Sequence, residues 1–252
     1  MILLFGGTTE GKRVAHYLNT VQLDYIYSTK TNIEFERHPH VQYRYGAFTE
    51  DDLATYIEKQ SVKLILDASH PFASQLHQTI AQVIARHSIP AIRFERIYFE
   101  RVIHPKIHYV SSIGAAIEKL YQIECHHLLA LTGVQSIAPM KSYWMEKQTT
   151  FRILPRETSI NQALAAGLLE KNILAAMPGQ GVKQEILLIQ NLEVDCILTK
   201  DSGESGFLSS KIEAAIQTQT NLIIVERPTI PESFQIVSTE QELEEQLKTL
   251  YL

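Results

Sequence analysis

The chain contains few of the residues and segments that mark secreted or membrane proteins. Its 252 residues include two cysteines, Cys125 and Cys196, which lie far apart in the sequence. A disulfide framework is therefore not expected, and a reducing cytoplasm is the simplest compartment. No apolar run approaches the ~20 residues that span a bilayer. The first residues also lack the basic region, longer apolar segment and cleavage site of a signal peptide. We expect a cytoplasmic protein with no membrane partner.

The chain has no excess of positive charge either. Lysine and arginine number 23 against 28 acidic residues, which gives a formal net charge of −5. A protein that relies on phosphate contacts to bind nucleic acid usually carries a basic excess, so no nucleic-acid partner is expected. Hydrophobic residues make up 45% of the chain and charged residues 20%, as in ordinary globular proteins.

Glycine is scarce, yet three of the 11 glycines, Gly6, Gly7 and Gly11, fall near the start of the chain. They follow a strand-length apolar run, Met1–Phe5, and precede a segment with helical apolar spacing. A glycine-rich turn at such a junction lets backbone N–H groups approach a phosphate at the positive end of the helix. The sequence GGTTEG differs from the G-x-G-x-x-G fingerprint of dinucleotide-binding proteins, so a turn that only packs the helix on the strand remains an alternative.

Strand-like and helix-like segments alternate along nearly the whole chain, which predicts an α/β fold with parallel sheets covered by helices on both faces. The length favours two domains of modest size over one very wide sheet, residues 1–100 and 101–252, with a boundary within 93–112. The expected strands are Ile2–Phe5, Leu23–Ser28, Leu64–Asp67, Ala91–Phe94, Leu128–Thr132, Phe151–Leu154, Ile173–Met177, Cys196–Thr199 and Leu222–Val225.

Ligands of such folds bind beyond the carboxyl ends of the strands, so the residues at these ends are the candidates for function. At the first strand, the hydroxyls of Thr8 and Thr9 are able to cap the helix or bind a phosphate. Ser28, Thr29 and Lys30 follow the second strand, where NAD-binding folds place an acidic residue. Two hydroxyls and a lysine suit a 2′-phosphate and favour NADPH over NADH; a solvated loop is the alternative.

A third strand end carries the sequence LILDASHPFA. The strand is expected to end at Asp67, and Ser69 or His70 to cap a helix that begins at Pro71. Asp67 and His70 would then stand beside the glycine turn, where they are candidates for a functional role. The alternative is that His70 is only a capping or packing residue.

A fourth strand end carries CILTKDSGESGFLSSKIEAA. Its polar turn contains Lys200, Asp201, Ser202 and Gly203, and the following helix carries Lys211. Backbone amides near glycines, together with two lysines, form a plausible anion site. A helix-capping loop with solvated lysines is the alternative.

No metal site is expected. Cys125 and the two histidines that follow it are adjacent, and adjacent residues on a strand point to opposite faces, so they do not all reach one ion.

Together these segments resemble the precorrin-6A and cobalt-precorrin-6A reductases of cobalamin (vitamin B12) biosynthesis. The matching motifs run in order along almost the whole chain, and the combination of the third and fourth strand ends is specific. The motifs are GGTTEGK at 6–12, LDASHPFA at 66–73, LTG at 131–133, RILPR at 152–156, AMPG at 176–179, TKDSG at 199–203, KIEAA at 211–215 and ERP at 226–228.

The resemblance implies an oxidoreductase that transfers a hydride from a reduced nicotinamide cofactor to the precorrin-6A macrocycle, giving precorrin-6B. It implies an α/β fold of two Rossmann-like parallel-sheet domains with a cleft between them, the cofactor by the glycine turn and the macrocycle in the cleft. The cofactor is expected to be NADPH, with NADH open, and the metal state of the ring is open. A non-catalytic NADP-sensing module is the alternative. The expected cofactor-binding residues are Gly6, Gly7, Thr8, Thr9, Gly11, Ser28, Thr29, Lys30, Asp67, Ser69 and His70.

A precorrin carries many carboxylates, which arginine and lysine bind well. A proton has to follow the hydride, and the candidate donors are His70, Lys200, Asp201 and water, among which the sequence does not choose. The residues expected to contact the substrate are Arg93, Arg152, Arg156, Lys200, Ser202, Gly203, Lys211 and Arg227.

Overall fold

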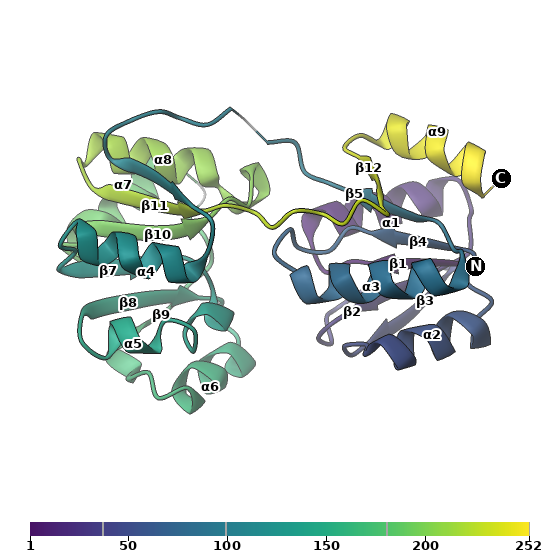
Figure 1. The fold of residues 1–252 in the computed structure, drawn as a ribbon, viewed down its shortest axis with the longest axis horizontal. Coiled ribbons are helices and arrows are strands. Elements are labelled where there is room, and N and C mark those ends of the chain that lie inside the picture. Colours follow the sequence, from purple (N-terminus) through teal and green to yellow (C-terminus); the bar gives the residue numbers. More distant parts are fainter. Residues whose placement is uncertain (37, 99, 180, 252) are drawn as a thin grey trace. The chain divides into compact units, whose positions relative to one another are not determined.

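The chain forms two compact units, each built around one parallel sheet (Figure 1). The structure is a computed structural model that describes residues 1–36, 38–98, 100–179 and 181–251. Unit 1 comprises Met1–Ile97 and Pro228–Leu252, and unit 2 comprises Tyr98–Arg227. Six strands form the sheet of each unit in the described residues. The predicted class of two parallel-sheet α/β domains is confirmed.

The sheet of unit 1 has the strand order β12-β5-β4-β1-β2-β3. Its register brings the ends of neighbouring strands together: Phe5 pairs with Ser28 on one side and with Asp67 on the other, and Ser28 pairs with Arg44. The residues that follow these strands therefore share one edge of the sheet. The strands are β1 (Ile2–Phe5), β2 (Tyr25–Thr29), β3 (Val41–Tyr45), β4 (Leu64–Asp67), β5 (Ala91–Phe94) and β12 (Gln235–Val237).

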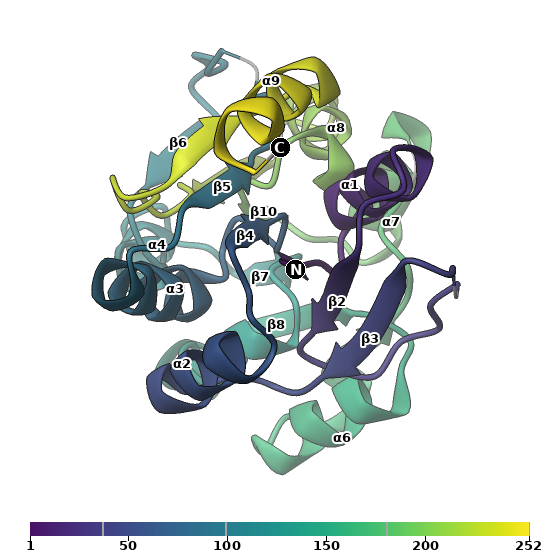
Figure 2. The ribbon, with the colours of Figure 1, turned by 90° about the vertical axis from the view of Figure 1, so that its right-hand side faces the viewer.

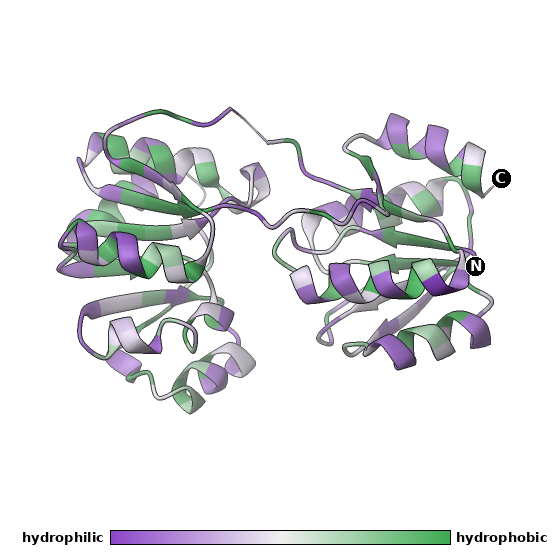
Figure 3. Ribbon diagram, viewed as in Figure 1, coloured by the Kyte–Doolittle hydropathy of each residue, from purple (hydrophilic) through white to green (hydrophobic). Residues whose placement is uncertain are grey.

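Helices cover both faces of this sheet because alternate strand residues point to opposite sides. Ile2 and Leu4 pack in one cluster with residues of α1 (Thr9–Thr20) and α9 (Glu240–Leu250). Leu3 and Phe5 pack in another cluster with residues of α2 (Glu50–Lys59) and α3 (Ser74–His87). Figure 2 shows these helix pairs on opposite sides of the sheet, and Figure 3 shows its hydrophobic strands.

Unit 2 has the strand order β6-β11-β10-β7-β8-β9, again parallel throughout. α7 and α8 pack on one face, and α4 contacts β6 and β11. The strands are β6 (Ile107–Val110), β7 (His127–Ala130), β8 (Gln148–Ile153), β9 (Ile173–Ala175), β10 (Cys196–Lys200) and β11 (Asn221–Val225). The helices are α4 (Ile113–Gln122), α5 (Lys141–Trp144), α6 (Glu157–Ala165), α7 (Val182–Asn191) and α8 (Leu208–Gln217). No described helix is both long and apolar enough to span a bilayer.

The structure corrects the expected organisation in three respects. Residues 228–252, expected in the second domain, return to unit 1, where β12 pairs with β5. Three strands, β3, β6 and β12, were not expected from the sequence; all contain partly exposed residues and lack a continuous apolar run. Helix α3 begins at Ser74 instead of Pro71, and its N-cap residue, Ala73, provides no side-chain cap. Neither Ser69 nor His70 caps this helix.

A substitution within residues 228–252 tests whether this segment belongs to unit 1. Leu243 on α9 is fully buried in the core of unit 1, so Leu243→Ala should lower the free energy of unfolding by about 2–5 kcal/mol. Amide hydrogen exchange should accelerate in β1, β4 and β5 and stay unchanged in β7 and β10. Ile236→Ala is the control, because Ile236 is 57% exposed on β12. Faster exchange confined to unit 2 would contradict the assignment.

Candidate active site

The glycine turn after β1 is packed against Tyr27 of β2. The Gly7 N–H donates to the Tyr27 hydroxyl at 2.9 Å, and the Gly6 N–H donates to the Ser28 carbonyl at 2.9 Å. A Cβ on Gly6 would lie only 2.3–2.5 Å from Tyr27 ring and hydroxyl atoms, and one on Gly11 would lie 2.7 Å from the Gly6 Cα. Close packing therefore accounts for Gly6 and Gly11, while Gly7 has a positive φ of 89°.

The first turn of α1 keeps amides available next to this packed region. Thr8 is the N-cap: its hydroxyl accepts from the Gly11 N–H at 2.9 Å and donates to the Ala68 carbonyl at 2.6 Å. No hydrogen bond among the described residues uses the backbone N–H of Thr8 or Thr9, and Thr9 is exposed. The positive end of α1 therefore presents backbone donors at the edge of the sheet.

The residues at the end of β2 differ in exposure. Ser28 and Thr29 are buried, and Lys30 is exposed. The Ser28 hydroxyl accepts from the Arg44 NH1 group at 2.7 Å, and the Thr29 hydroxyl donates to the Thr31 carbonyl at 2.8 Å. Arg44 lies on β3, a strand that the sequence did not reveal, so its place beside Ser28 was missed.

The last residue of β4, Asp67, belongs to a buried ionic cluster. The Asp67 carboxylate is fully buried and lies 3.0 Å from Arg93 NH1 and 3.3 Å from His77 Nε2. Arg93 also pairs with Glu95 at 3.0 Å, and the Ser69 hydroxyl lies 3.3 Å from both Arg93 NH1 and His77 Nε2. Burial lowers the pKa of His77, against the opposing effect of Asp67.

The contacts within this cluster differ from the ligand contacts that were expected for Arg93, Asp67 and Ser69. Arg93 is 1% exposed and engaged by two carboxylates, so its guanidinium is not available to a substrate carboxylate. The side chains of Asp67 and Ser69 make their contacts within the same internal cluster. His70 is exposed at this edge, where its Nδ1 accepts from the Phe72 N–H at 3.1 Å.

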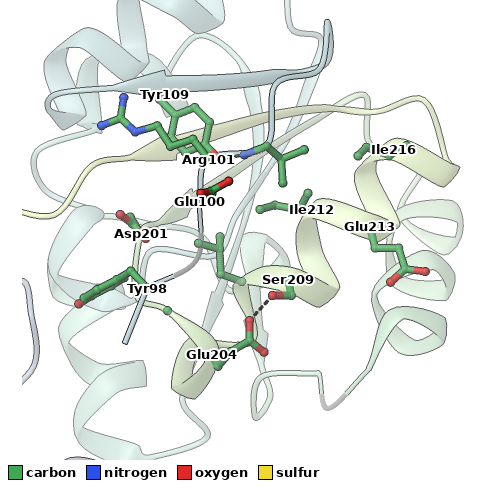
Figure 4. Close-up of a pocket in the computed structure, with 13 residues that line it drawn as sticks. Tyr98, Glu100, Arg101, Tyr109, Asp201, Glu204, Ser209, Ile212, Glu213 and Ile216 are labelled. Carbon is green, nitrogen blue, oxygen red and sulfur yellow. Dashed lines mark hydrogen bonds between the residues drawn. The ribbon is translucent and has the colours of Figure 1, made fainter. Parts of the chain in front are cut away.

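In unit 2, the turn after β10 faces a pocket. The pocket has a volume of about 250 Å³ and includes Asp201 and Gly203 of the TKDSG motif (Figure 4). Its apolar wall is formed by Val102, Tyr109, Leu208, Ile212 and Ile216.

Charged groups of the same turn are partly buried. The Asp201 carboxylate pairs with Arg227 at 2.9 Å, and the Arg227 guanidinium lies 3.4 Å from the centre of the Tyr98 ring. Burial raises the pKa of Asp201, and Arg227 opposes that shift. Burial also lowers the pKa of Lys200. Ser202 and Gly203 are buried, and Gly203 has a positive φ of 64°.

Two other residues that were expected to contact the substrate, Arg152 and Lys211, are buried in unit 2. Arg152 NH1 lies 2.9 and 3.1 Å from the two carboxylate oxygens of Glu185. The Lys211 Nζ donates to the Gly206 carbonyl at 2.6 Å and to the Thr199 hydroxyl at 3.3 Å. Arg152 is 8% exposed and Lys211 5% exposed, so neither side chain is positioned for direct contact with a ligand at the surface.

The arginines separate into two classes. Among those in the described ranges, only Arg44 and Arg156 form no ion pair with a carboxylate. Arg156 is exposed just before α6, as a surface role in substrate binding requires. The paired arginines are Arg13, Arg86, Arg93, Arg96, Arg101, Arg152 and Arg227.

Cys125 lies beside Asp195 and Cys196, which stand at the start of β10. Sulfur atoms of Cys125 and Cys196 and a carboxylate oxygen of Asp195 lie within 4.8 Å of one another. Both cysteines are free and buried, and the Asp195 carboxylate accepts from the backbone N–H groups of His126 and His127. These bonds give Asp195 a structural role in joining β7 and β10.

Loss of the Arg93 side chain should be severely destabilising. Arg93→Ala leaves the buried carboxylate of Asp67 without its cation, so we expect the free energy of unfolding to fall by about 3–5 kcal/mol. Arg156→Ala, which removes an exposed arginine, should change it by no more than about 0.5 kcal/mol. Denaturant unfolding measures both, and equal midpoints for the two variants would contradict the structural role of Arg93.

Lys211 predicts a specific dependence of stability on pH. Burial, and secondarily the charge of Arg152, lower its pKa from 10.5 to about 8 in the folded chain. Above about pH 8 the folded state loses the Lys211 proton, whereas the unfolded state keeps it up to about pH 10.5. The contribution of Lys211 to the free energy of unfolding is therefore a term that rises with pH over this interval.

Lys211→Met removes this term. The wild type should therefore gain stability relative to the variant between about pH 7.5 and about pH 9.5 in urea unfolding. Lys63→Met, at an exposed lysine, is the control. A constant difference between wild type and Lys211→Met would contradict the prediction.

Comparison with known proteins identifies the family. A model of the precorrin-6x reductase CbiJ/CobK family matches residues 1–248. A cobalt-precorrin-6A reductase of Priestia megaterium is 28% identical over 248 residues, which cover 91% of each chain. Another, of Synechocystis sp., is 29% identical over 236 residues, covering 91% of this chain and 90% of the relative.

A solved structure shares the fold. The structure of CobK precorrin-6A reductase covers 99% of this chain and 96% of its own, with a TM-score of 0.79 and 21% sequence identity. These findings confirm the resemblance drawn from the sequence motifs. The chain belongs to the precorrin-6x reductase CbiJ/CobK family, and it is an oxidoreductase of cobalamin biosynthesis.

Proposed function

We propose that this chain reduces precorrin-6A, or its cobalt-loaded form, to the dihydro product with NADPH as the reductant. The observation that carries the proposal is made at the carboxyl edge of the unit 1 sheet: the backbone N–H groups of Thr8 and Thr9 form no hydrogen bond among the described residues, and Lys30 is exposed. The names of the curated relatives support the choice of substrate. Some of them are named cobalt-precorrin-6A reductase and others precorrin-6A reductase, so both rings belong in the assay.

The cofactor phosphates have two groups of partners in unit 1. The pyrophosphate lies at the positive end of α1, against Gly7, Thr8 and Thr9, where backbone donors favour an anion. The 2′-phosphate of NADPH lies beside Ser28 and Lys30. When bound, the cofactor supplies the hydride, and the protein orients it and sets the surrounding charge.

The macrocycle carboxylates have their partners in unit 2. The exposed Arg156 and the partly exposed Lys200 and Arg227 bind them directly. Arg152 and Lys211 contribute from inside: with Glu185 they place two buried cations beside one carboxylate, which favours an anionic substrate. Ser202 and Gly203 shape the turn that carries Lys200.

One proton completes the reaction: a hydride and a proton add two hydrogens across one double bond of the ring, and NADPH becomes NADP⁺. Burial lowers the pKa of Lys200 and raises that of Asp201, and both shifts move these groups toward the range in which a general acid works at neutral pH. Lys200 and Asp201 are the proposed donors in unit 2, and His70 is the proposed donor in unit 1.

An anaerobic assay tests the function. Purified protein is mixed with NADPH and precorrin-6A, and separately with the cobalt-loaded ring, while absorbance of the nicotinamide and of the macrocycle is recorded. We expect both bands to change together. Arg156→Ala should raise the KM for the ring about tenfold, the effect of one lost charge-assisted contact, with little change in kcat.

One outcome would count against this function, and another would count only against the role of Arg156. Binding of NADPH without oxidation in the presence of either ring would favour the non-catalytic NADP-sensing alternative. Unchanged KM in Arg156→Ala, together with normal turnover, would remove Arg156 from the substrate contacts. Ser159→Ala, on the same helix and without a charge, is a control for changes in α6.

A further inference from the structure

Arg44 stands at the end of β3, directly opposite Ser28 of β2 in the parallel register. We propose that Arg44 is the residue that selects NADPH over NADH, by binding the 2′-phosphate of the cofactor. The inference rests on the proposed function, because it assigns one contact within the proposed cofactor site.

The guanidinium of Arg44 is held in place before any ligand arrives. NH1 donates to the Ser28 hydroxyl at 2.7 Å, and NH2 donates to the carbonyls of Tyr45 and Gly46 at 3.1 and 2.9 Å. Its central carbon lies 3.8 Å from the centre of the Phe48 ring. An arginine fixed in this way loses little conformational entropy when it binds an anion.

Hydrogen-bonding capacity remains for a ligand. A guanidinium has five N–H donors, and the three bonds named above leave two of them unused among the described residues. The remaining donors are the Nε–H and the second N–H of NH1, and each of them is able to donate one charge-assisted hydrogen bond to a phosphate oxygen.

The charge of Arg44 is also uncompensated. It is half-buried, burial lowers its pKa, and no carboxylate in the described part of the chain forms an ion pair with it. Arg93 and Arg152, the buried arginines, each contact a carboxylate. A partly desolvated cation without an anion is stabilised by an anionic ligand, so this position favours one.

The location identifies the anion. In dinucleotide-binding folds the ribose of the adenosine lies beyond the end of the second strand, where an acidic residue binds its 2′-hydroxyl or a nearby arginine accommodates a 2′-phosphate. Here β2 ends in Ser28 and Thr29, Lys30 follows, and Arg44 is adjacent on β3. The site therefore offers two cations to the 2′ position, and Ser28, Thr29 and Lys30 bring no carboxylate to it.

Binding of two nucleotides tests the assignment without requiring turnover. Adenosine 2′,5′-bisphosphate carries the 2′-phosphate, and 5′-AMP does not. In calorimetric titrations of the full chain, Arg44→Gln should weaken the bisphosphate about 10- to 100-fold, as expected for a lost arginine–phosphate contact, and change 5′-AMP by less than about twofold. Arg44→Lys should lie between wild type and Arg44→Gln.

The control is Lys63→Gln, which removes an exposed positive charge just before β4, at the opposite edge of the same sheet. It should leave both affinities unchanged. Equal weakening of both nucleotides by Arg44→Gln would show that the residue only supports the fold of the site and would overturn the proposal. An unchanged preference would also overturn it.

Steady-state assays separate this inference from the proposed function. We expect Arg44→Gln to reduce kcat/KM for NADPH about 10- to 100-fold with NADH nearly unaffected. Ring reduction with an unaltered preference in Arg44→Gln overturns the role of Arg44 and leaves the function standing. Selective loss of bisphosphate binding in a chain that reduces neither ring supports the role of Arg44 and overturns the proposed function.

Discussion

The buried ion pair between Asp67 and Arg93 is the interaction on which the candidate cofactor edge depends. Asp67 of β4 and Arg93 of β5 are paired in the parallel register. His77 contacts Asp67, and Glu95 and the Ser69 hydroxyl contact Arg93. Removal of Arg93 leaves the buried carboxylate of Asp67 without its cation, so the cluster fixes the ends of β4 and β5 and the start of α3 to one another. Because Thr8 bonds to the Ala68 carbonyl, the glycine turn is fixed against this cluster.

The distribution of arginines follows from the same physics. A buried guanidinium requires a carboxylate partner: Arg93 pairs with Asp67 and Glu95, and Arg152 pairs with Glu185. The two described arginines without such a partner lie at strand ends, Arg44 in β3 and Arg156 after β8. The buried pairs of Arg93 and Arg152 stabilise their units, and Arg44 and Arg156 leave positive charge for anionic ligands.

Sequence patterns predicted the alternating α/β order, the parallel sheets and the glycine turn, because these follow from local apolar periodicity and turn chemistry. They did not predict the roles of Arg93, Arg152 and Lys211. Whether a cation faces solvent depends on carboxylates and carbonyls from distant segments: Glu185 lies 33 residues beyond Arg152. Arg44 was missed because β3 is a partly exposed edge strand without an apolar run, and the return of 228–252 to unit 1 carries no local signal at all.

The two units hold their unpaired arginines differently, and the difference matches the ligands proposed for them. Arg44 is fixed by a hydroxyl, two carbonyls and an aromatic ring, which suits one phosphate at a defined position on a rigid nucleoside. Arg156 is exposed, and its side chain keeps its rotamer freedom, which suits a carboxylate on the flexible arm of a large ring. A fixed arginine distinguishes ligands that differ by a single phosphate, whereas a mobile one accommodates variation in substrate position. On the proposed assignments, discrimination between cofactors belongs to unit 1, and attraction of the macrocycle belongs to unit 2.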